Sequence, residues 1–196
     1  MPTVLAQAAG IVGWLVVVAA AAWWILSWRL RQRLERLSRL IPQFGGSVGR
    51  RRWLVPTWSG SFQGLPISIS VQAEWEYLPL SLYAAVDTGA RWSLYVVRET
   101  WLTGFAKRLG LRKIVTRDAI FDRAFLLYSA RPDEAARILR EERIKQAVRD
   151  LFSWGCDTLI IDARRIVASK SGVTDEALDP LALTRVFTAM ATLQAA

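Results

Sequence analysis

The side chains that most often carry enzyme chemistry are scarce in this sequence. It contains no histidine and a single cysteine, Cys156. Without histidine, His-based triads, most zinc sites and histidine ligation of haem are excluded, and one cysteine cannot form a thiolate metal cluster. Cys156 lies between the end of a predicted helix and a predicted strand, which favours a small core residue over a nucleophile.

Carboxylates are the remaining candidates for chemistry. Asp118 and Asp122 stand four residues apart, and Asp157 and Asp162 bracket a short apolar strand. Either pair could bind Mg²⁺ or act as general acid and base, yet the same spacing is typical of strand ends and of surface ion pairs with neighbouring arginines. No other group converges on them in the sequence, so we predict no catalytic residue, no cofactor and no metal site.

Tryptophan and arginine are the more telling residues. The chain holds 10 tryptophans, and six of them follow residue 52. Six in one small domain can all be core, but some are expected at the surface, where Trp and Arg are the residues of protein interface hot spots. The six are Trp53, Trp58, Trp75, Trp92, Trp101 and Trp154.

The uncharged N-terminal stretch is the element that would determine where the remaining domain lies. From Pro2 to Trp28 there is no charged residue, and as a helix this stretch would reach ~40 Å, enough to cross a bilayer. Arginines follow it and none precedes it, which places the N-terminus outside by the positive-inside rule. A cleaved signal peptide is disfavoured, because the apolar run is too long and its start lacks positive charge.

One face of this predicted span favours a helical partner. The small residues Ala6, Ala9, Gly10 and Gly13 recur at small-xxx-small spacing, although Ala and Gly are also simply common in spans. Trp14 would lie in mid-membrane, where packing on protein explains an indole better than lipid does. We therefore predict a helix-docking face. Three tryptophans and five arginines are predicted at the inner membrane interface: Trp23, Trp24, Trp28, Arg29, Arg31, Arg33, Arg36 and Arg39.

A basic neck follows the predicted span. Residues 29–52 carry eight arginines against one acid, a net charge of +7 out of +9 for the chain. Leu30, Leu34, Leu37 and Ile41 recur at helical spacing, which predicts a short amphipathic helix that lies on anionic lipid or starts a seam with a partner. A glycine-rich joint ends this segment, and it lacks the Gly-Lys-Ser/Thr ending of a phosphate-binding loop.

The remaining residues predict one soluble α+β domain, an antiparallel sheet with helices packed on one face. Ile67, Ile69 and Val71 alternate with polar residues, which is typical of a half-buried antiparallel strand. Strands are predicted at 53–58, 60–75, 80–86, 92–97, 124–129, 158–162 and 165–168, and helices at 99–109, 132–151 and 180–194. The domain division is therefore 1–28 transmembrane helix, 29–52 basic neck and joint, and 53–196 α+β domain.

Two segments resemble a class of uncharacterised membrane-anchored bacterial domains. They are Gly60-Ser-Phe-Gln-Gly-Leu-Pro-Ile-Ser-Ile69 and Phe121-Asp-Arg-Ala-Phe-Leu-Leu-Tyr-Ser-Ala-Arg-Pro-Asp-Glu-Ala135. The resemblance involves turn and core positions and implies the layout alone; it implies no functional residue.

These features predict a non-enzymatic accessory subunit of a larger membrane protein complex, by analogy a respiratory or photosynthetic one, in the bacterial inner membrane with its C-terminal domain in the cytoplasm. Its expected partners are other membrane protein subunits and anionic lipid headgroups. Nucleic acid is not expected, because residues 53–196 carry a net charge of only +2. Two alternatives stay open: a membrane-tethered binding or signalling module for a soluble ligand or anionic lipid, and a carboxylate-dependent membrane-anchored enzyme.

Overall fold

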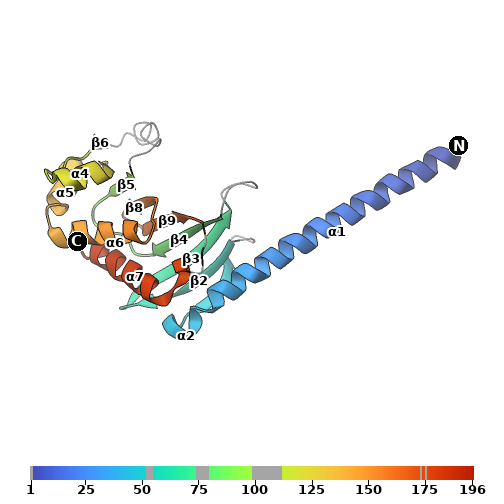
Figure 1. Ribbon diagram of the computed structural model, residues 1–196, viewed down its shortest axis with the longest axis horizontal. Helices are drawn as coiled ribbons and strands as arrows, with labels where there is room; N and C mark the ends of the chain where they lie inside the picture. The colour runs from blue at the N-terminus through green and yellow to red at the C-terminus, as the bar shows by residue number, and fades with distance from the viewer. Residues whose placement is uncertain (1, 52–54, 74–79, 99–111, 173, 175) are drawn as a thin grey trace.

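The chain forms a sheet-and-helix domain from which one long helix projects. The computed structural model describes residues 2–51, 55–73, 80–98, 112–172, 174 and 176–196. The projecting helix, α1 (Pro2–Ser38), leaves the domain as a single rod whose N-terminal end lies far from the sheet (Figure 1). A four-residue helix, α2 (Ile41–Phe44), follows at its base.

The prediction of a transmembrane helix is wrong. Among the residues that the structure describes, no helix is long and apolar enough to cross a membrane. The uncharged stretch is instead the first part of α1, which continues without a break through the arginine-rich segment to Ser38. This finding corrects the predicted fold class, a transmembrane helix plus a soluble α+β domain, and it overturns the predicted single-pass location in the bacterial inner membrane.

The sheet has nine described strands, and every described pairing is antiparallel. Their order across the sheet is β1-β2-β3-β4-β9-β8-β5-β7-β6. The meander β1 to β4 joins the second half through β9, so the last strand of the chain lies in the middle. The strands are β1 (Ser47–Arg51), β2 (Val55–Phe62), β3 (Leu65–Ala73), β4 (Leu80–Val86), β5 (Leu94–Arg98), β6 (Arg112–Lys113), β7 (Phe125–Ser129), β8 (Thr158–Ile161) and β9 (Ile166–Ser171).

Buried side chains recur at every second residue along the strands, so one face of the sheet is buried. In β3 the side chains of Ile67, Ile69 and Val71 are buried, while Ser70 and Gln72 on the other face are half-exposed; Ser68 on that face is buried. The neighbouring strand β4 repeats the pattern, because Leu82 and Ala84 are buried beside Val71 and Ile69. One face of the sheet therefore supplies the apolar half of the core.

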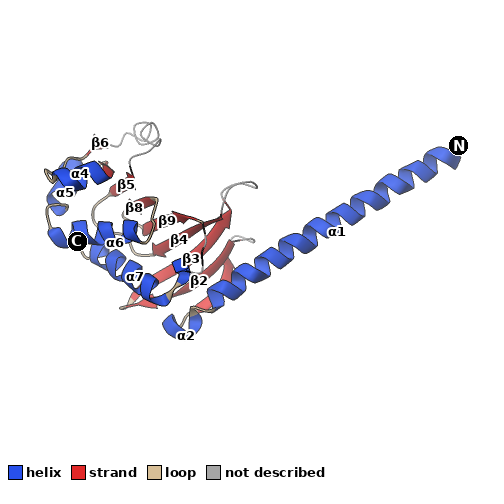
Figure 2. Cartoon of the chain, viewed as in Figure 1, coloured by secondary structure: helices blue, strands red, loops and turns tan. Residues whose placement is uncertain are grey.

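Helices cover that face. Figure 2 shows α6 (Glu142–Ser153) and α7 (Pro180–Gln194) in front of the strands, and the two helices contact each other. Pro180 follows the N-cap Asp179, whose carboxylate accepts a hydrogen bond from the Ala182 amide. Three short elements complete the layer: α4 (Ala119–Ala124), α5 (Pro132–Ile138) and the 3₁₀ helix η1 (Glu176–Leu178).

The base of α1 is built into the core. Leu37 and Leu40 are fully buried, and α1 contacts strands β1 and β2. Phe44 then packs edge-on against Trp58 of β2 and Phe187 of α7, with ring centroids 6.0 and 5.6 Å apart. Aromatic packing thus ties the base of the long helix to the C-terminal helix.

Several elements differ from the prediction. The predicted helix 132–151 is two helices, α5 and α6, and α4, β6 and η1 were not expected. The strand β1 lies within the segment assigned to a glycine-rich joint. The predicted helix at 99–109 lies outside the described residues, as do Trp53, Trp75 and Trp101. The division at residue 53 stays a prediction.

Candidate functional site

The first candidate pair of carboxylates lies at the start of α4, where both side chains satisfy backbone groups. Asp122 accepts hydrogen bonds from the amide of Thr116 at 2.9 and 3.0 Å, from its hydroxyl at 2.8 Å and from the amide of Arg117 at 3.2 Å. Asp118 is the N-cap of α4 and accepts from the Phe121 amide at 3.1 Å. Each aspartate therefore fixes the turn that leads into α4.

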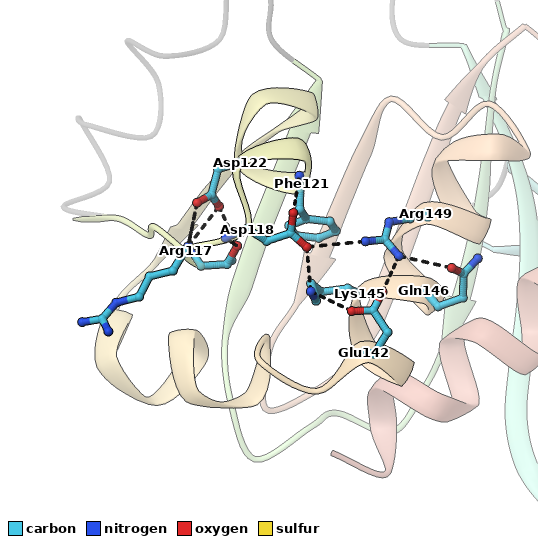
Figure 3. Close-up of polar contacts among 9 residues, drawn as sticks. Arg117, Asp118, Phe121, Asp122, Glu142, Lys145, Gln146 and Arg149 are labelled. Atoms are coloured by element: carbon cyan, nitrogen blue, oxygen red, sulfur yellow. Dashed lines mark hydrogen bonds and ion pairs between the residues drawn. The ribbon is translucent and has the colours of Figure 1, made fainter.

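Asp118 also belongs to a charged cluster that joins α4 to α6, which we call the α4–α6 cluster (Asp118, Glu142, Lys145 and Arg149). Figure 3 shows these side chains converging between the two helices. Nζ of Lys145 lies 2.6 Å from Oδ2 of Asp118 and 2.7 Å from Oε2 of Glu142. Arg149 pairs with Glu142 at 2.6 Å and stacks over the ring of Phe121, 5.6 Å from its centroid.

The electrostatics of this cluster keep Asp118, Glu142 and Lys145 ionised near neutral pH. The ammonium of Lys145 lowers the pKa of Asp118, with help from the Phe121 amide, and Lys145 and Arg149 lower the pKa of Glu142. Hydrogen bonds to Asp118 and Glu142 raise the pKa of Lys145. A general acid or base working near neutral pH needs a pKa moved toward 7, and these groups are moved away from it. The arrangement is suited to holding α4 on α6.

The second pair, Asp157 and Asp162, also serves turns. Asp157 accepts from the Ser171 amide at 2.5 Å, and Asp162 accepts from the amides of Arg164 and Arg165 at 2.7 and 2.9 Å. The two aspartates bracket β8, as the sequence predicts, but they do not meet the Asp118 pair in one site. In the described part of the chain no group of three or more Cys, Asp or Glu residues could hold a metal ion.

Cys156 is a core residue, as its position in the sequence predicts. Its side chain is buried between α6 and β8, and its thiol donates to the carbonyl of Thr158 at 3.0 Å. Burial raises the pKa of the thiol to about 12. Because the thiolate is the nucleophile, a thiol in this environment is inert near neutral pH.

The described tryptophans of the domain are structural. Trp58 and Trp92 are fully buried, and their indole N–H groups donate to the carbonyls of Gly45 and Leu193 at 2.9 and 3.3 Å. Trp154 is half-buried and donates to the carbonyl of Ala177 at 3.1 Å. The expectation of tryptophans at the domain surface is not met by these three.

The exposed tryptophans lie on α1 instead. Trp14, Trp23 and Trp24 are 74%, 72% and 69% exposed, and Trp28 is 51% exposed. Val17, Val18 and Ile25 are also exposed on the same helix. The predicted docking residues Ala6, Ala9, Gly10 and Gly13 lie in the first part of α1, but their side-chain surroundings, like those of Arg29 and Arg33, are outside the described residues.

The remaining predicted interface arginines lie at the base of α1. Arg31 and Arg39 are exposed and Arg36 is half-buried. Arg36 and Arg39, with Gln43 of α2, form one wall of a groove of about 630 Å³. Its other wall comes from η1 and the start of α7, and we call this space the root groove (Arg36, Arg39, Gln43, Glu176, Leu178, Asp179 and Pro180).

No pattern in the sequence indicates the root groove. Its two walls are separated by more than half of the chain, and the packing of Phe44 on Phe187 is one of the contacts that bring them together. The local signal is a pair of leucines three residues apart, Leu37 in the last turn of α1 and Leu40 in the turn that follows, and both are buried in the core.

The comparisons with known proteins concern the fold. No family model matches the sequence, and no curated protein matches it. The structure is similar to the crystal structure of the mycobacterial trehalose monomycolate transport factor A, TtfA, with a TM-score of 0.50 and 12% sequence identity. The match covers 84% of this chain and 93% of that chain. At this identity the similarity shows a related fold and does not identify functional residues.

Proposed function

We propose that this chain is a non-enzymatic accessory protein that docks onto a partner protein through α1. The observation that carries the proposal is the exposure of Trp14, Trp23 and Trp24 on a helix that projects from the domain (Figure 1). Contiguous large apolar side chains are rarely left in water on a monomer, and they mark interaction surfaces. Tryptophan is also the residue most enriched among interface hot spots.

The chemistry of α1 describes the partner surface. The exposed side chains of Trp14, Val17, Val18 and Ile25 are large and apolar, so this part of α1 would lie in an apolar groove or against another apolar helix. Arg31 and Arg39 are exposed nearer the domain, where acidic side chains at the rim of the partner would complement them. The buried Leu37 and Leu40 support this role, because a docked helix can hold the domain in position on the partner only if the base of the helix is fixed to the domain.

The non-enzymatic part of the proposal rests on the described polar groups. The four candidate aspartates accept backbone hydrogen bonds, and Cys156 is buried. The carboxylate-dependent enzyme is therefore the weaker alternative. The similar fold of the mycobacterial transport factor makes transport the first process in which to look for the partner, by analogy at the level of the fold.

The experiment that tests the proposal is site-specific photo-crosslinking of the full chain in its own host. A photo-crosslinking amino acid replaces Trp14, Val17 or Trp24 on α1, and the crosslinked protein is identified by mass spectrometry. If α1 docks into a groove, the same partner is captured from all three positions. Matched controls place the amino acid at Ile120 and Leu181, which are 81% and 74% exposed on the domain.

A second measurement tests how much the tryptophans contribute to the affinity for the partner. The double variant Trp23→Ser/Trp24→Ser is expected to lower recovery of that partner at least about tenfold, because each buried tryptophan contributes more than 1.4 kcal/mol at a hot spot. The control Ile120→Ser/Leu181→Ser removes as many exposed apolar side chains and leaves recovery unchanged. Capture of the same partner equally from the domain positions, or no loss in the tryptophan variant, contradicts the proposal.

Binding of anionic lipid headgroups by the arginines stays the second candidate function. Arg31 and Arg39 are exposed at the end of α1 nearer the domain, which is the observation that favours it. Replacing both with Gln should abolish selectivity for anionic over neutral vesicles while leaving capture of a protein partner intact. If the variant keeps its selectivity for anionic vesicles but loses capture of the protein partner, the result supports docking alone.

A further inference from the structure

The root groove is a hollow between two elements that the chain brings together from its opposite ends. The last turn of α1 and helix α2 form one wall, and η1 and the first turn of α7 form the other. Its volume of about 630 Å³ falls in the ~300–1,000 Å³ range of small-molecule sites. The groove lies at the base of α1, whereas Trp14 and Trp24 lie several turns nearer the N-terminus of the same helix, so the groove does not belong to the proposed docking surface.

The charges of the root groove cancel. Arg36 and Arg39 bring two positive charges, and Glu176 and Asp179 bring two negative charges, so the sum is zero. A free anion placed there meets two carboxylates, and a cation meets two guanidinium groups. The polar lining as a whole is therefore suited to a ligand without net charge.

The hydrogen-bond donors and acceptors of the root groove further restrict the class of ligand. The guanidinium group of Arg39 only donates, the carboxylates of Glu176 and Asp179 only accept, and the amide of Gln43 does both. A hydroxyl group donates once and accepts twice, so a ligand with several hydroxyls can satisfy both walls at the same time. Asp179 already accepts from the Ala182 amide through Oδ2 at 3.1 Å, which holds its carboxylate in place in the lining of the groove.

Apolar surface completes the match. Leu178, which is only 8% exposed, and the half-buried Pro180 line the groove beside the charged groups, and they offer a small apolar surface for C–H groups. A sugar ring combines a hydroxylated edge with apolar C–H faces. We infer that the root groove binds a neutral, polyhydroxylated ligand of the size of a mono- or disaccharide, free or as a headgroup.

Binding there would have a structural consequence. A ligand held by Arg39 and Asp179 joins the base of α1 to the N-terminal end of α7, alongside the contact of Phe44 with Phe187. It would therefore slow local opening at the base of α1. This inference does not depend on what α1 docks against, because it uses only residues 36–43 and 176–180 of the chain.

The test is a titration of the full chain with trehalose, a neutral non-reducing disaccharide, followed by amide chemical shifts. Saturable shifts confined to residues around the root groove are expected. Inorganic phosphate and glycine betaine are titrated in parallel, because they represent an anionic and a zwitterionic ligand. Both are expected to bind more weakly than the sugar.

Four variants make the result specific. Arg39→Gln and Glu176→Gln each remove one exposed charged group of the groove and should weaken trehalose binding at least about tenfold, since a lost hydrogen bond to a charged group has this effect. Arg31→Gln on α1 and Asp133→Asn on α5 remove exposed charges elsewhere and should leave the affinity unchanged. Unchanged thermal unfolding shows that the groove variants are folded.

Three outcomes overturn the inference. They are the absence of saturable shifts with trehalose, trehalose binding that survives both Arg39→Gln and Glu176→Gln, and tighter binding of phosphate or betaine than of the sugar. None of these outcomes bears on crosslinking from Trp14 or Trp24, so failure of the groove and failure of the docking proposal are distinguishable.

Discussion

Nζ of Lys145 lies 2.6 Å from Oδ2 of Asp118, and the two residues are separated by 27 positions in the chain. The pair joins the N-cap of α4 to the first turn of α6, and Glu142 adds a second carboxylate at 2.7 Å. Lys145 is largely buried, so its charge depends on these partners. Removing the lysine leaves two carboxylates side by side without their shared cation.

The first prediction follows from this pair. Lys145→Met should lower the Tm by several degrees, whereas Lys113→Met, at an exposed lysine of β6, should change it little. The measurement is thermal unfolding followed by circular dichroism. Equal effects of the two substitutions would contradict the structural role of the cluster.

The pH dependence of the first prediction has a definite sign. The pKa values of Asp118 and Glu142 are lowered from 3.8 and 4.5, so their contribution is complete above those values and is lost as the pH falls through the lowered pKa. The pKa of Lys145 is raised from 10.5, so its contribution is complete below 10.5 and is lost as the pH rises through the raised pKa. The stability difference between wild type and Lys145→Met should therefore be largest from about pH 5 to about pH 10.

The second prediction concerns the buried base of α1. Leu37→Ala and Leu40→Ala should each lower the free energy of unfolding by about 2–5 kcal/mol, because each leaves a cavity in the core. Ile41→Ala truncates a neighbouring side chain that is 38% exposed and should cost less than about 1 kcal/mol. Urea unfolding of the three variants measures the order. If the base of α1 were not packed into the core, the three variants would show similar, small losses in the free energy of unfolding.

The third prediction concerns the close approach of two backbone segments. A Cβ atom on Gly46 would lie 2.2 Å from the carbonyl oxygen of Ser59, and Gly46 has a φ of +83°. Gly46→Ala should therefore destabilise the protein by about 2 kcal/mol or more, from the clash and the left-handed conformation together. In Gly49→Ala the new methyl group meets open space at an ordinary φ, so the cost should stay within about 0.5 kcal/mol.

Gly45→Ala separates the two causes of the third prediction. Gly45 has a φ of +65° but open space around the position of a Cβ atom, so its substitution pays only the conformational cost of about 1 kcal/mol. The expected order of stability loss by urea unfolding is Gly46, then Gly45, then Gly49. A cost at Gly49 as large as that at Gly46 would mean that the pairing of β1 with β2 differs from the observed register.

Much of the sheet could be predicted from local pattern. The alternation of Ile67, Ile69 and Val71 places a strand with one buried face, and β3 has that face buried. The helix predicted at 132–151 is interrupted, because the four residues between Leu139 and Ile144 are all charged and offer no apolar side chain to the core. Two shorter helices can each turn their apolar residues inward.

The prediction for α1 failed because absence of charge was taken as apolarity. Residues 2–28 include many Ala and Gly residues and four tryptophans, whose side chains are small or carry an N–H group. The candidate sites could not be predicted for a different reason. The root groove joins residues 36–43 to residues 176–180, and no local spacing records which distant segments will pack together.

The last prediction concerns the reactivity of Cys156. Burial raises the pKa of its thiol from 9.0 to about 12, so at pH 8 only about one molecule in ten thousand carries the thiolate. Alkylation by iodoacetamide at pH 8 should therefore be slow in the folded chain and fast in denaturant, as mass spectrometry can follow.

Because the folded pKa is the higher one, the stability contributed by the protonated thiol is complete below pH 9.0 and declines as the pH rises toward 12. Cys156→Ala should thus flatten this alkaline part of the stability profile, and rapid alkylation of the folded wild type would refute the burial of the thiol.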